Sequence, residues 1–297
     1  MLIQQKLEIM EKFSNNEREV AKYILLNKNN LKELSITEIS KKTFTSPSTT
    51  VRLTQKLGYK GYKEFKEAYI SEIEYIQSHF HDIDPNIPFT SQHSLTDITH
   101  IIAKMLSDSI YDTSKIINQN ELYKCSHLLA KAESIYIFAI TNTAAIAHDF
   151  IYKMKYLNKK ITLVDNPEDF IFTLTSMNQR DCAIFISYSG ETFDIFNLKK
   201  YFINRKFKTI SITSLGDNSL INKTDYHLYI STREKLSSKI GHFISSQSIH
   251  YILDLLYASV FSLDYDSNLD KKFSLAKGID YERNSKVSIL QEKDYND

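Results

Sequence analysis

The 297-residue sequence has no tryptophan, two cysteines, four prolines and six glycines. Cys125 and Cys182 are too few for a disulfide framework and are typical of buried thiols in a reducing compartment. No apolar run approaches the ~20 residues of a membrane span, and residues 1–10 lack the apolar core of a signal peptide. The sequence therefore predicts a cytoplasmic protein with no membrane partner and enough chain for one or two domains.

Several kinds of chemical site are also missing. No glycine-rich nucleotide loop is present, and the nine histidines lack metal-ligand spacing, so we expect no cofactor and no metal. His148 and Asp149 favour an exposed pair over a base with its orienting group, and we expect His242 to face solvent. We therefore predict no catalytic residue, although Glu191 and Glu234 stay open as general bases.

The charge is unevenly distributed, although the net charge is only +1. Residues 1–77 carry 13 basic and 10 acidic side chains, against 24 and 26 in the remainder. Residues 41–66 alone carry seven Lys or Arg against one acid. A basic module joined to a neutral one indicates that the first part meets a polyanion.

Helical periodicity runs through the first 77 residues. We expect an amphipathic helix over residues 2–13 and a short helix over 36–42. Between them, Ser14 and Glu17 have the spacing of a capping box that opens another helix. A further helix follows Tyr62. Residues 1–78 are therefore predicted to form an all-α domain.

A basic helix is predicted to begin at Pro47, which suits the first helical position. Ser46 can cap its free amides, and Gly58 suits the left-handed residue at which a helix ends. The short helix before it completes a helix-turn-helix. A run of charges alone is usually a solvated face. Here, however, small hydroxyl residues occupy the first turn and cations follow them, an arrangement that suits the DNA major groove. The predicted DNA-binding residues are Ser46, Ser48, Thr49, Thr50, Arg52, Lys56, Lys60 and Lys63.

The predicted roles within this set differ. We expect Ser48, Thr49, Thr50 and Arg52 to lie nearest the base edges of the DNA. The three lysines are expected to pair with phosphates and to dominate the salt dependence.

The remainder of the chain is predicted to be an α/β domain. Residues 79–95, with two prolines, interrupt the periodicity as a linker. Residues 96–265 alternate helical segments with β-prone runs, which predicts a five-stranded parallel sheet flanked by helices, an αβα sandwich. Residues 266–297 are a C-terminal tail, either a helix or loose chain. The expected strands are 134–140, 161–164, 182–187, 209–213 and 227–230, and the expected helices are 97–117, 120–132, 144–157, 167–177, 192–204 and 240–262, with a short helical turn near 218–223.

Hydroxyl groups follow three of these strands. In a parallel sheet, ligands bind beyond the carboxyl ends of the strands, and hydroxyl and amide donors at a helix start suit a phosphate. One such loop alone would favour helix capping, but three neighbouring loops favour a ligand site. The predicted ligand-binding residues are Thr141, Asn142, Thr143, Ser187, Ser189, Gly190, Thr192 and Ser238.

Two motifs resemble a known family. The pattern S-x-x-T-x-x-R-[FL]-x-x-x-L-G-[FY]-x-G-[FY] of the RpiR-type helix-turn-helix is matched by Ser46, Thr49, Arg52, Leu53, Leu57, Gly58, Tyr59, Gly61 and Tyr62. The phosphosugar loop S-x-S-G-x-T of the sugar isomerase (SIS) domain is matched by Ser187, Ser189, Gly190 and Thr192. The resemblance covers about residues 1–265. In place of the family's G-x-G-x-S after the first SIS strand, this chain has Ala139-Ile140-Thr141-Asn142-Thr143.

The resemblance implies a bacterial-type transcription regulator of carbohydrate-metabolism genes. Its helix-turn-helix would bind operator DNA, and its SIS domain would sense a phosphorylated sugar and form a homodimer or tetramer. Two alternatives stay open: a sugar-phosphate isomerase or lyase with an accessory N-terminal module, and a SIS domain that serves only dimerisation.

Overall fold

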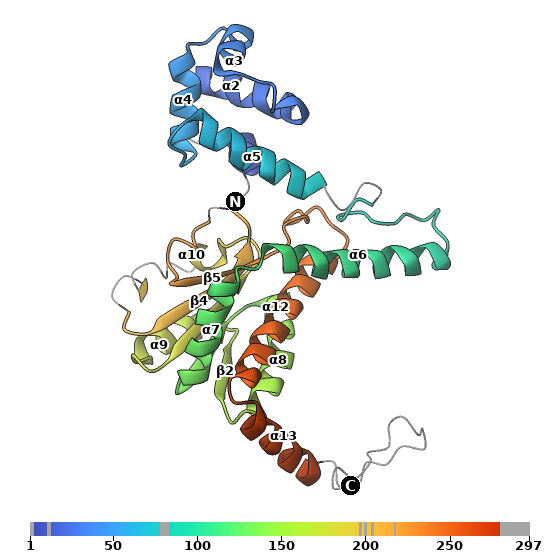
Figure 1. Cartoon of the computed structure of the whole chain (residues 1–297), viewed down its shortest axis with the longest axis vertical. Helices are drawn as coiled ribbons and strands as arrows, with labels where there is room; N and C mark the ends of the chain where they lie inside the picture. Colours follow the sequence, from blue (N-terminus) through green and yellow to red (C-terminus); the bar gives the residue numbers. More distant parts are fainter. Residues whose placement is uncertain are drawn as a thin grey trace.

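The computed structural model of the chain describes residues 3–10, 13–77, 83–195, 198, 201–202, 205–216 and 218–279. Figure 1 shows a helical domain at the N-terminal end and a second domain built around a β-sheet. Within the described ranges, no helix combines the length and the hydropathy that a membrane crossing requires.

The N-terminal domain is all-α, as the sequence predicts. Its capping box is confirmed: Ser14 N–H donates to Glu17 Oε2 at 2.7 Å, and Glu17 N–H donates to Ser14 Oγ at 3.4 Å. The first helix is shorter than expected, because Met10 adopts a left-handed φ of 53° that ends it. The elements are α1 (Ile3–Ile9), α2 (Asn15–Leu26), a 3₁₀ turn (Lys28–Asn30), α3 (Ile36–Thr43), α4 (Pro47–Lys56) and α5 (Tyr62–Gln77).

One hydrophobic core holds these helices together. Leu7, Ile24, Leu53 and Phe65, from four different helices, are fully buried in it. Burying a side chain of this size stabilises a fold by about 1.5–3 kcal/mol. The helix stop at Gly58 is also confirmed, since its φ is +96°. The core thereby fixes the orientation of α4.

The second domain contains a parallel sheet with strand order β2-β1-β3-β4-β5. The prediction of five parallel strands is confirmed, and their bounds lie within a few residues of those expected. The elements are α6 (Leu95–Ile116), α7 (Gln119–Lys131), β1 (Ser134–Phe138), α8 (Thr141–Lys155), β2 (Lys160–Val164), α9 (Pro167–Ser176), β3 (Cys182–Ser187), α10 (Thr192–Ile195), β4 (Lys208–Ser214), β5 (Tyr226–Ile230), α12 (Phe243–Ser262) and α13 (Tyr265–Ile279).

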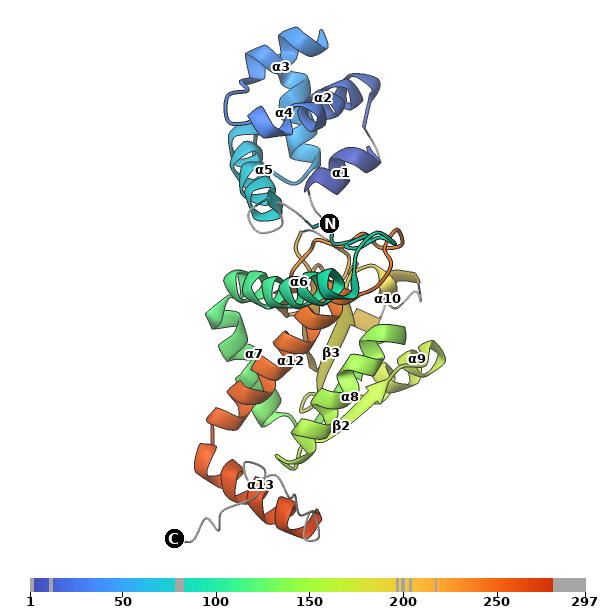
Figure 2. The same cartoon turned by 90° about the vertical axis from the view of Figure 1, so that its right-hand side faces the viewer.

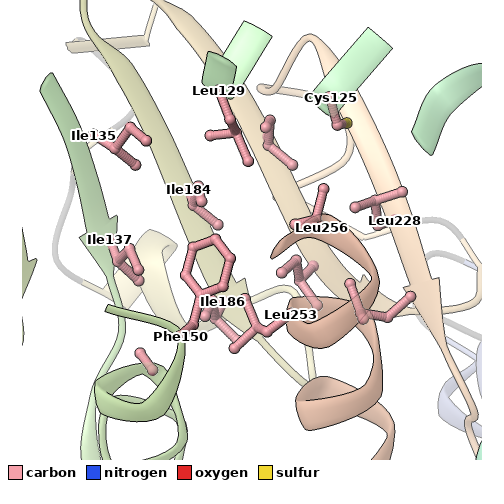
Figure 3. Close-up of a cluster of buried hydrophobic side chains, with 14 of the residues drawn as sticks. Cys125, Leu129, Ile135, Ile137, Phe150, Ile184, Ile186, Leu228, Leu253 and Leu256 are labelled. Carbon is pink, nitrogen blue, oxygen red and sulfur yellow. The ribbon is translucent and has the colours of Figure 1, made fainter. Parts of the chain in front are cut away.

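Two hydrophobic layers cover the sheet and make the αβα sandwich. On one face, aliphatic strand residues such as Ile137 and Ile184 pack against α7, α8 and α12 (Figures 2 and 3). On the other face, Phe138 and Phe185 stack with ring centroids 4.7 Å apart and pack against Phe170 of α9. Successive side chains of one strand, such as Ile137 and Phe138, therefore pack into the hydrophobic layers on opposite faces of the sheet.

Residues 219–223 form the short turn that was expected, and Asn218 Oδ1 caps it by accepting the N–H groups of Leu220 and Ile221. Two other segments differ from the expectation. Helix α12 begins at Phe243, three residues later than expected. Of the expected helix over 192–204, α10 covers Thr192–Ile195, and much of the rest lies outside the described residues. In the tail, α13 is a helix, and residues 280–297 are outside the description.

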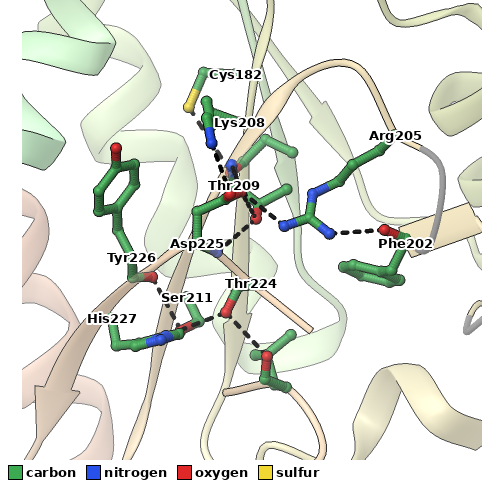
Figure 4. A network of polar contacts seen from close by, with 12 residues as sticks. Cys182, Phe202, Arg205, Lys208, Thr209, Ser211, Thr224, Asp225, Tyr226 and His227 are labelled. Carbon is green, nitrogen blue, oxygen red and sulfur yellow. Dashed lines mark hydrogen bonds and ion pairs between the residues drawn. The ribbon is translucent and has the colours of Figure 1, made fainter. Parts of the chain in front are cut away.

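A polar network ties the amino ends of β4 and β5 together (Figure 4). The Asp225 carboxylate accepts hydrogen bonds from Arg205 at 2.7 Å, from Lys208 at 3.0 Å, and from the backbone and hydroxyl of Thr209 at 2.9 and 2.8 Å. Burial raises the pKa of Asp225, but these donors outweigh it and lower the pKa to about 2. The edge opposite the hydroxyl-rich loops is thereby fastened.

Candidate functional site

The outer face of α4 carries part of the predicted DNA-binding set. Ser48 and Arg52 are exposed and lie four residues apart, so they share one face of the helix. Thr49 and Thr50 are 1% and 0% exposed, so their predicted contact with base edges is wrong for this fold. They lie on the side of α4 that carries Leu53, which packs into the helical core.

Ser46 is the N-cap residue of α4, but its side chain does not cap a backbone amide. Its hydroxyl lies 3.1 Å from the Thr49 hydroxyl, and its carbonyl accepts the Thr49 N–H at 2.9 Å. The predicted position is therefore right and the predicted bond is wrong. The exposed Ser46 side chain is instead oriented by a buried threonine.

The predicted phosphate-binding lysines have different surroundings. Lys60 and Lys63 are exposed. Lys56 forms an ion pair at 2.7 Å with Glu17, whose side chain is 4% exposed. Burial raises the pKa of Glu17, and its bonds with Lys56 and Ser14 outweigh that effect and lower the pKa. Lys56 therefore fastens α4 to α2, in contrast to its expected pairing with a DNA phosphate.

The turn between α3 and α4 carries an exposed aromatic residue that the sequence reasoning missed. Phe44 adopts a left-handed φ of 53° and is 96% exposed. Its N–H and that of Thr45 both donate to the Ser40 carbonyl. Bulky residues rarely adopt this conformation, so residue type gave no signal for the turn geometry.

A pocket of about 190 Å³ opens at the carboxyl ends of β1 and β3. Two hydroxyl-rich loops predicted from the sequence meet there, one after each strand. Ser238 is exposed and Gly190 does not line the pocket, so these two predictions were misplaced. The predicted residues that line it are Thr141, Asn142, Thr143, Ser187, Ser189 and Thr192.

The loop after β3 is organised by its own hydroxyls. Ser187 Oγ lies 2.8 Å from Thr192 Oγ1 and accepts the Gly190 N–H at 3.0 Å. Ser189 Oγ accepts the Glu191 N–H at 3.1 Å. Gly190 has a φ of +73°, and a Cβ there would lie 2.1 Å from the Asn218 side chain. Glycine is required at this position, so Gly190 shapes the loop without lining the cavity.

The loop after β1 contains a left-handed residue that is not a glycine. Thr141 adopts a left-handed φ of 51° at the mouth of the pocket. Thr143 holds the turn, because its hydroxyl donates to the Ile140 carbonyl at 2.8 Å. Asn142 donates to Ser246 Oγ at 2.8 Å. A β-branched residue with this φ is a true backbone outlier, so strain is placed beside the cavity.

The segment between β5 and α12, residues 231–242, closes the pocket. It contributes Leu236, Lys239 and His242, which were not among the predicted ligand-binding residues, and His242 faces the cavity as well as solvent. The Lys239 ammonium bonds to Glu234 at 2.9 Å and lies 4.9 Å from the Tyr188 ring centroid. Lys239 lies in a segment without helix or strand, so no periodicity in the sequence indicated that it would reach the hydroxyl-rich loops.

The two candidate general bases are engaged elsewhere. Glu234 is 4% exposed and also accepts the Ile244 N–H at 2.5 Å and the Ser245 hydroxyl at 2.6 Å. Glu191 accepts the Ser219 N–H at 3.0 Å. Of the residues that line the cavity in the described parts of the chain, none is a carboxylate.

A second cluster lies on α8 and α12. Asp149, His250 and Asp254 bring potential ligand atoms within 4.8 Å of one another. However, Lys153 Nζ already lies 2.6 Å from Asp149 and 2.5 Å from Asp254. Asp149 is therefore part of an ion-pair network, and the expected His148–Asp149 pair is replaced by contacts of Asp149 with Lys153 and His250.

The fold and these sites define a helix-turn-helix protein with a pocket-bearing parallel-sheet domain. Residues 1–82 match the model described as "Helix-turn-helix domain, rpiR family", and residues 128–259 match the SIS domain. The first 82 residues therefore belong to the rpiR family of helix-turn-helix domains, and they are followed by a SIS domain.

Individual relatives are similar to this chain over most of their own length. An HTH-type transcriptional regulator of Caldanaerobacter subterraneus is 26% identical over 87% of this chain and 90% of its own. The structure of NanR from Vibrio vulnificus, complexed with ManNAc-6P, superposes with a TM-score of 0.61 at 23% identity, covering 95% of this chain and 99% of NanR. The sugar isomerase domain of an RpiR transcription factor from Sphaerobacter thermophilus has a TM-score of 0.53 at 13% identity, covering 61% and 98%.

Proposed function

We propose that this regulator senses a phosphorylated sugar in its SIS domain and controls carbohydrate-metabolism genes through operator DNA. One observation carries the proposal: Ser187, Ser189 and Thr192 line the same pocket as Lys239. Several neutral donors with one cation suit a phosphate group. NanR, whose fold is similar, was solved with a sugar phosphate.

The two sides of the pocket have different proposed tasks. The phosphate would lie against the loop after β3, where hydroxyls and Lys239 converge. Thr141, Asn142 and Thr143 would face the sugar from the loop after β1. Among the described lining residues Lys239 is the only lysine or arginine, and its ammonium is shared with Glu234, so neutral hydroxyl donors would supply much of the binding.

Calorimetry with ManNAc-6P, glucose 6-phosphate and inorganic phosphate tests the proposal. We expect Ser187→Ala to weaken binding of the sugar phosphate that the wild type binds by about 10- to 100-fold, because a hydrogen bond to a charged group contributes roughly 1.5–3 kcal/mol. Ser238→Ala is the matched control, since Ser238 is exposed and outside the cavity. Absence of wild-type binding at millimolar concentration would instead favour a SIS domain that serves only dimerisation.

For DNA, we propose that Ser46, Ser48 and Arg52 face the base edges and that Lys60 and Lys63 bind phosphates. Their exposure on α4 and at the start of α5 supports this assignment. A helix-turn-helix protein commonly reads two half-sites as a dimer. We therefore propose a homodimer or tetramer, to be measured by light scattering during size-exclusion chromatography.

We also propose that the protein is not an enzyme. The engagement of Glu191 and Glu234 in fixed hydrogen bonds supports this. A coupled isomerase assay tests it, and we expect no turnover. Turnover that disappears in Glu234→Gln would overturn this proposal and support the isomerase alternative.

A further inference from the structure

The linker before α6 is bonded directly to the segment that closes the pocket. Asn86 is 7% exposed although it lies in a loop. Its side-chain Oδ1 accepts the Lys235 N–H at 2.7 Å, and its carbonyl accepts the Ile240 N–H at 3.0 Å. In Figure 2 the chain that precedes α6 runs beside the segment that leads into α12.

The two bonded amides enclose the pocket-lining part of this segment. Lys235 and Ile240 flank residues 236–239, which include Leu236 and Lys239 of the pocket wall. Lys239 is adjacent to Ile240, and its side chain is held by Glu234. If a ligand favours one arrangement of residues 236–239, the positions of the Lys235 and Ile240 amides, which donate to Asn86, change with it.

Asn86 itself is oriented from within the linker. Asp84 Oδ1 accepts its backbone N–H at 2.8 Å and its side-chain amide at 3.0 Å. The amide nitrogen is thus turned to Asp84 and its oxygen to Lys235. The hydrogen bond from the Asn86 backbone lowers the pKa of Asp84, so the carboxylate is charged at neutral pH. The Asn86 side chain is therefore held in one orientation between the linker and the pocket-lining segment.

The position of Asn86 in the chain gives this contact its importance. It lies after α5, the last helix of the DNA-binding domain, and before α6. We propose that Asn86 is a positioning residue through which occupancy of the pocket changes DNA affinity, an inference that rests on the sensing function proposed above. Allosteric coupling requires that the ligand prefer one arrangement of a shared element, and here that element is residues 235–240 with Asn86.

The experiment compares the full-length wild type with Asn86→Ala. The DNA probe is a duplex selected in vitro against the wild type, and the ligands are ManNAc-6P, glucose 6-phosphate and inorganic phosphate. For the ligand that binds, we expect saturation to change wild-type DNA affinity by about 5- to 150-fold. In Asn86→Ala this ratio should fall close to one, whereas calorimetric ligand binding and ligand-free DNA binding are retained.

Two further measurements separate coupling from general damage. Gln92→Ala, at an exposed position of the same linker, should keep the wild-type ratio. Hydrogen exchange should show faster exchange at the Lys235 amide in Asn86→Ala, with the melting curve still cooperative. An unchanged ratio in Asn86→Ala overturns the inference alone. A wild-type ratio of one despite ligand binding removes ligand control of DNA affinity, and the inference with it. Failure of every sugar phosphate to bind the wild type removes the sensing function and this inference together.

Discussion

Two non-glycine residues stand in left-handed conformations at the two functional regions. Phe44 lies in the turn before α4, and Thr141 lies at the mouth of the pocket. Such residues persist where surrounding structure imposes the conformation, and they are concentrated at functional sites. Thr141, which stands where the family motif has its second glycine, thus has a left-handed conformation that glycine adopts without a steric cost.

Replacing Thr141 by glycine should raise stability. Relief of the left-handed conformation gains about 1–2 kcal/mol, and the greater freedom of glycine in the unfolded chain offsets roughly 0.5–1 kcal/mol. We expect Thr141→Gly to raise the melting temperature by about 1–4 °C. Ala145→Gly, at an exposed position within α8, is the control and should lower it. A lower melting temperature in Thr141→Gly would mean that the strain is absent.

Arg52 is the residue for which we expect the largest effect on operator specificity. Loss of a side chain that contacts a base costs about 1–3 kcal/mol, so Arg52→Ala should weaken specific binding by roughly 5- to 150-fold. Binding to unrelated DNA should change much less. Gel shifts with selected and scrambled duplexes measure both, with Arg18→Ala, an exposed position on α2, as the control. Equal operator affinity in Arg52→Ala and wild type would remove Arg52 from the interface.

Among the elements, β4 and β5 depend on one carboxylate at their amino ends. The folded pKa of Asp225 is about 2, below the ~3.9 of an unfolded aspartate. A lowered pKa stabilises the fold above the unfolded value, and this contribution is lost as pH falls from about 4 towards 2. Asp225 therefore contributes to stability at neutral pH and little in strong acid.

Asp225→Asn tests this dependence. We expect the free energy of unfolding to fall by about 2 kcal/mol at pH 7 and the difference from wild type to shrink as pH approaches 3. Urea denaturation at both pH values is the measurement. Asp270→Asn, at an exposed position of α13, should have little effect at either pH. An equal loss for Asp225→Asn at pH 7 and pH 3 would contradict a role for the charge.

The elements that the sequence predicted well are the helices and strands, whose apolar residues recur at regular spacing. Apolar strands separated by helices predicted the sheet, and the rule that ligands bind at carboxyl ends predicted the loops at Thr141 and Ser187. Lys239 lies in a segment without helix or strand, so no period indicated that it reaches those loops. The burial of Thr49 and Thr50 depends on how α2 and α3 pack against α4, which the local motif does not encode.

At the scale of the whole molecule, DNA binding and ligand binding are built on separate hydrophobic cores. The helical core of residues 3–73 shares no residue with the two layers that cover the sheet. Each site is therefore held by its own packing, and communication requires a particular connection. The hydrogen bond between Lys235 and Asn86 in the linker is such a connection. Replacing the Asn86 side chain therefore tests whether pocket occupancy changes DNA affinity.

The two edges of the sheet have a consequence for how such a protein can diversify. The pocket lies at the carboxyl edge, in loops after β1, β3 and β5, and the Asp225 network lies at the amino edge. Substitutions that reshape the pocket therefore fall at positions remote from those that fasten the strands. A descendant of this chain could acquire a new effector while inheriting its scaffold unchanged.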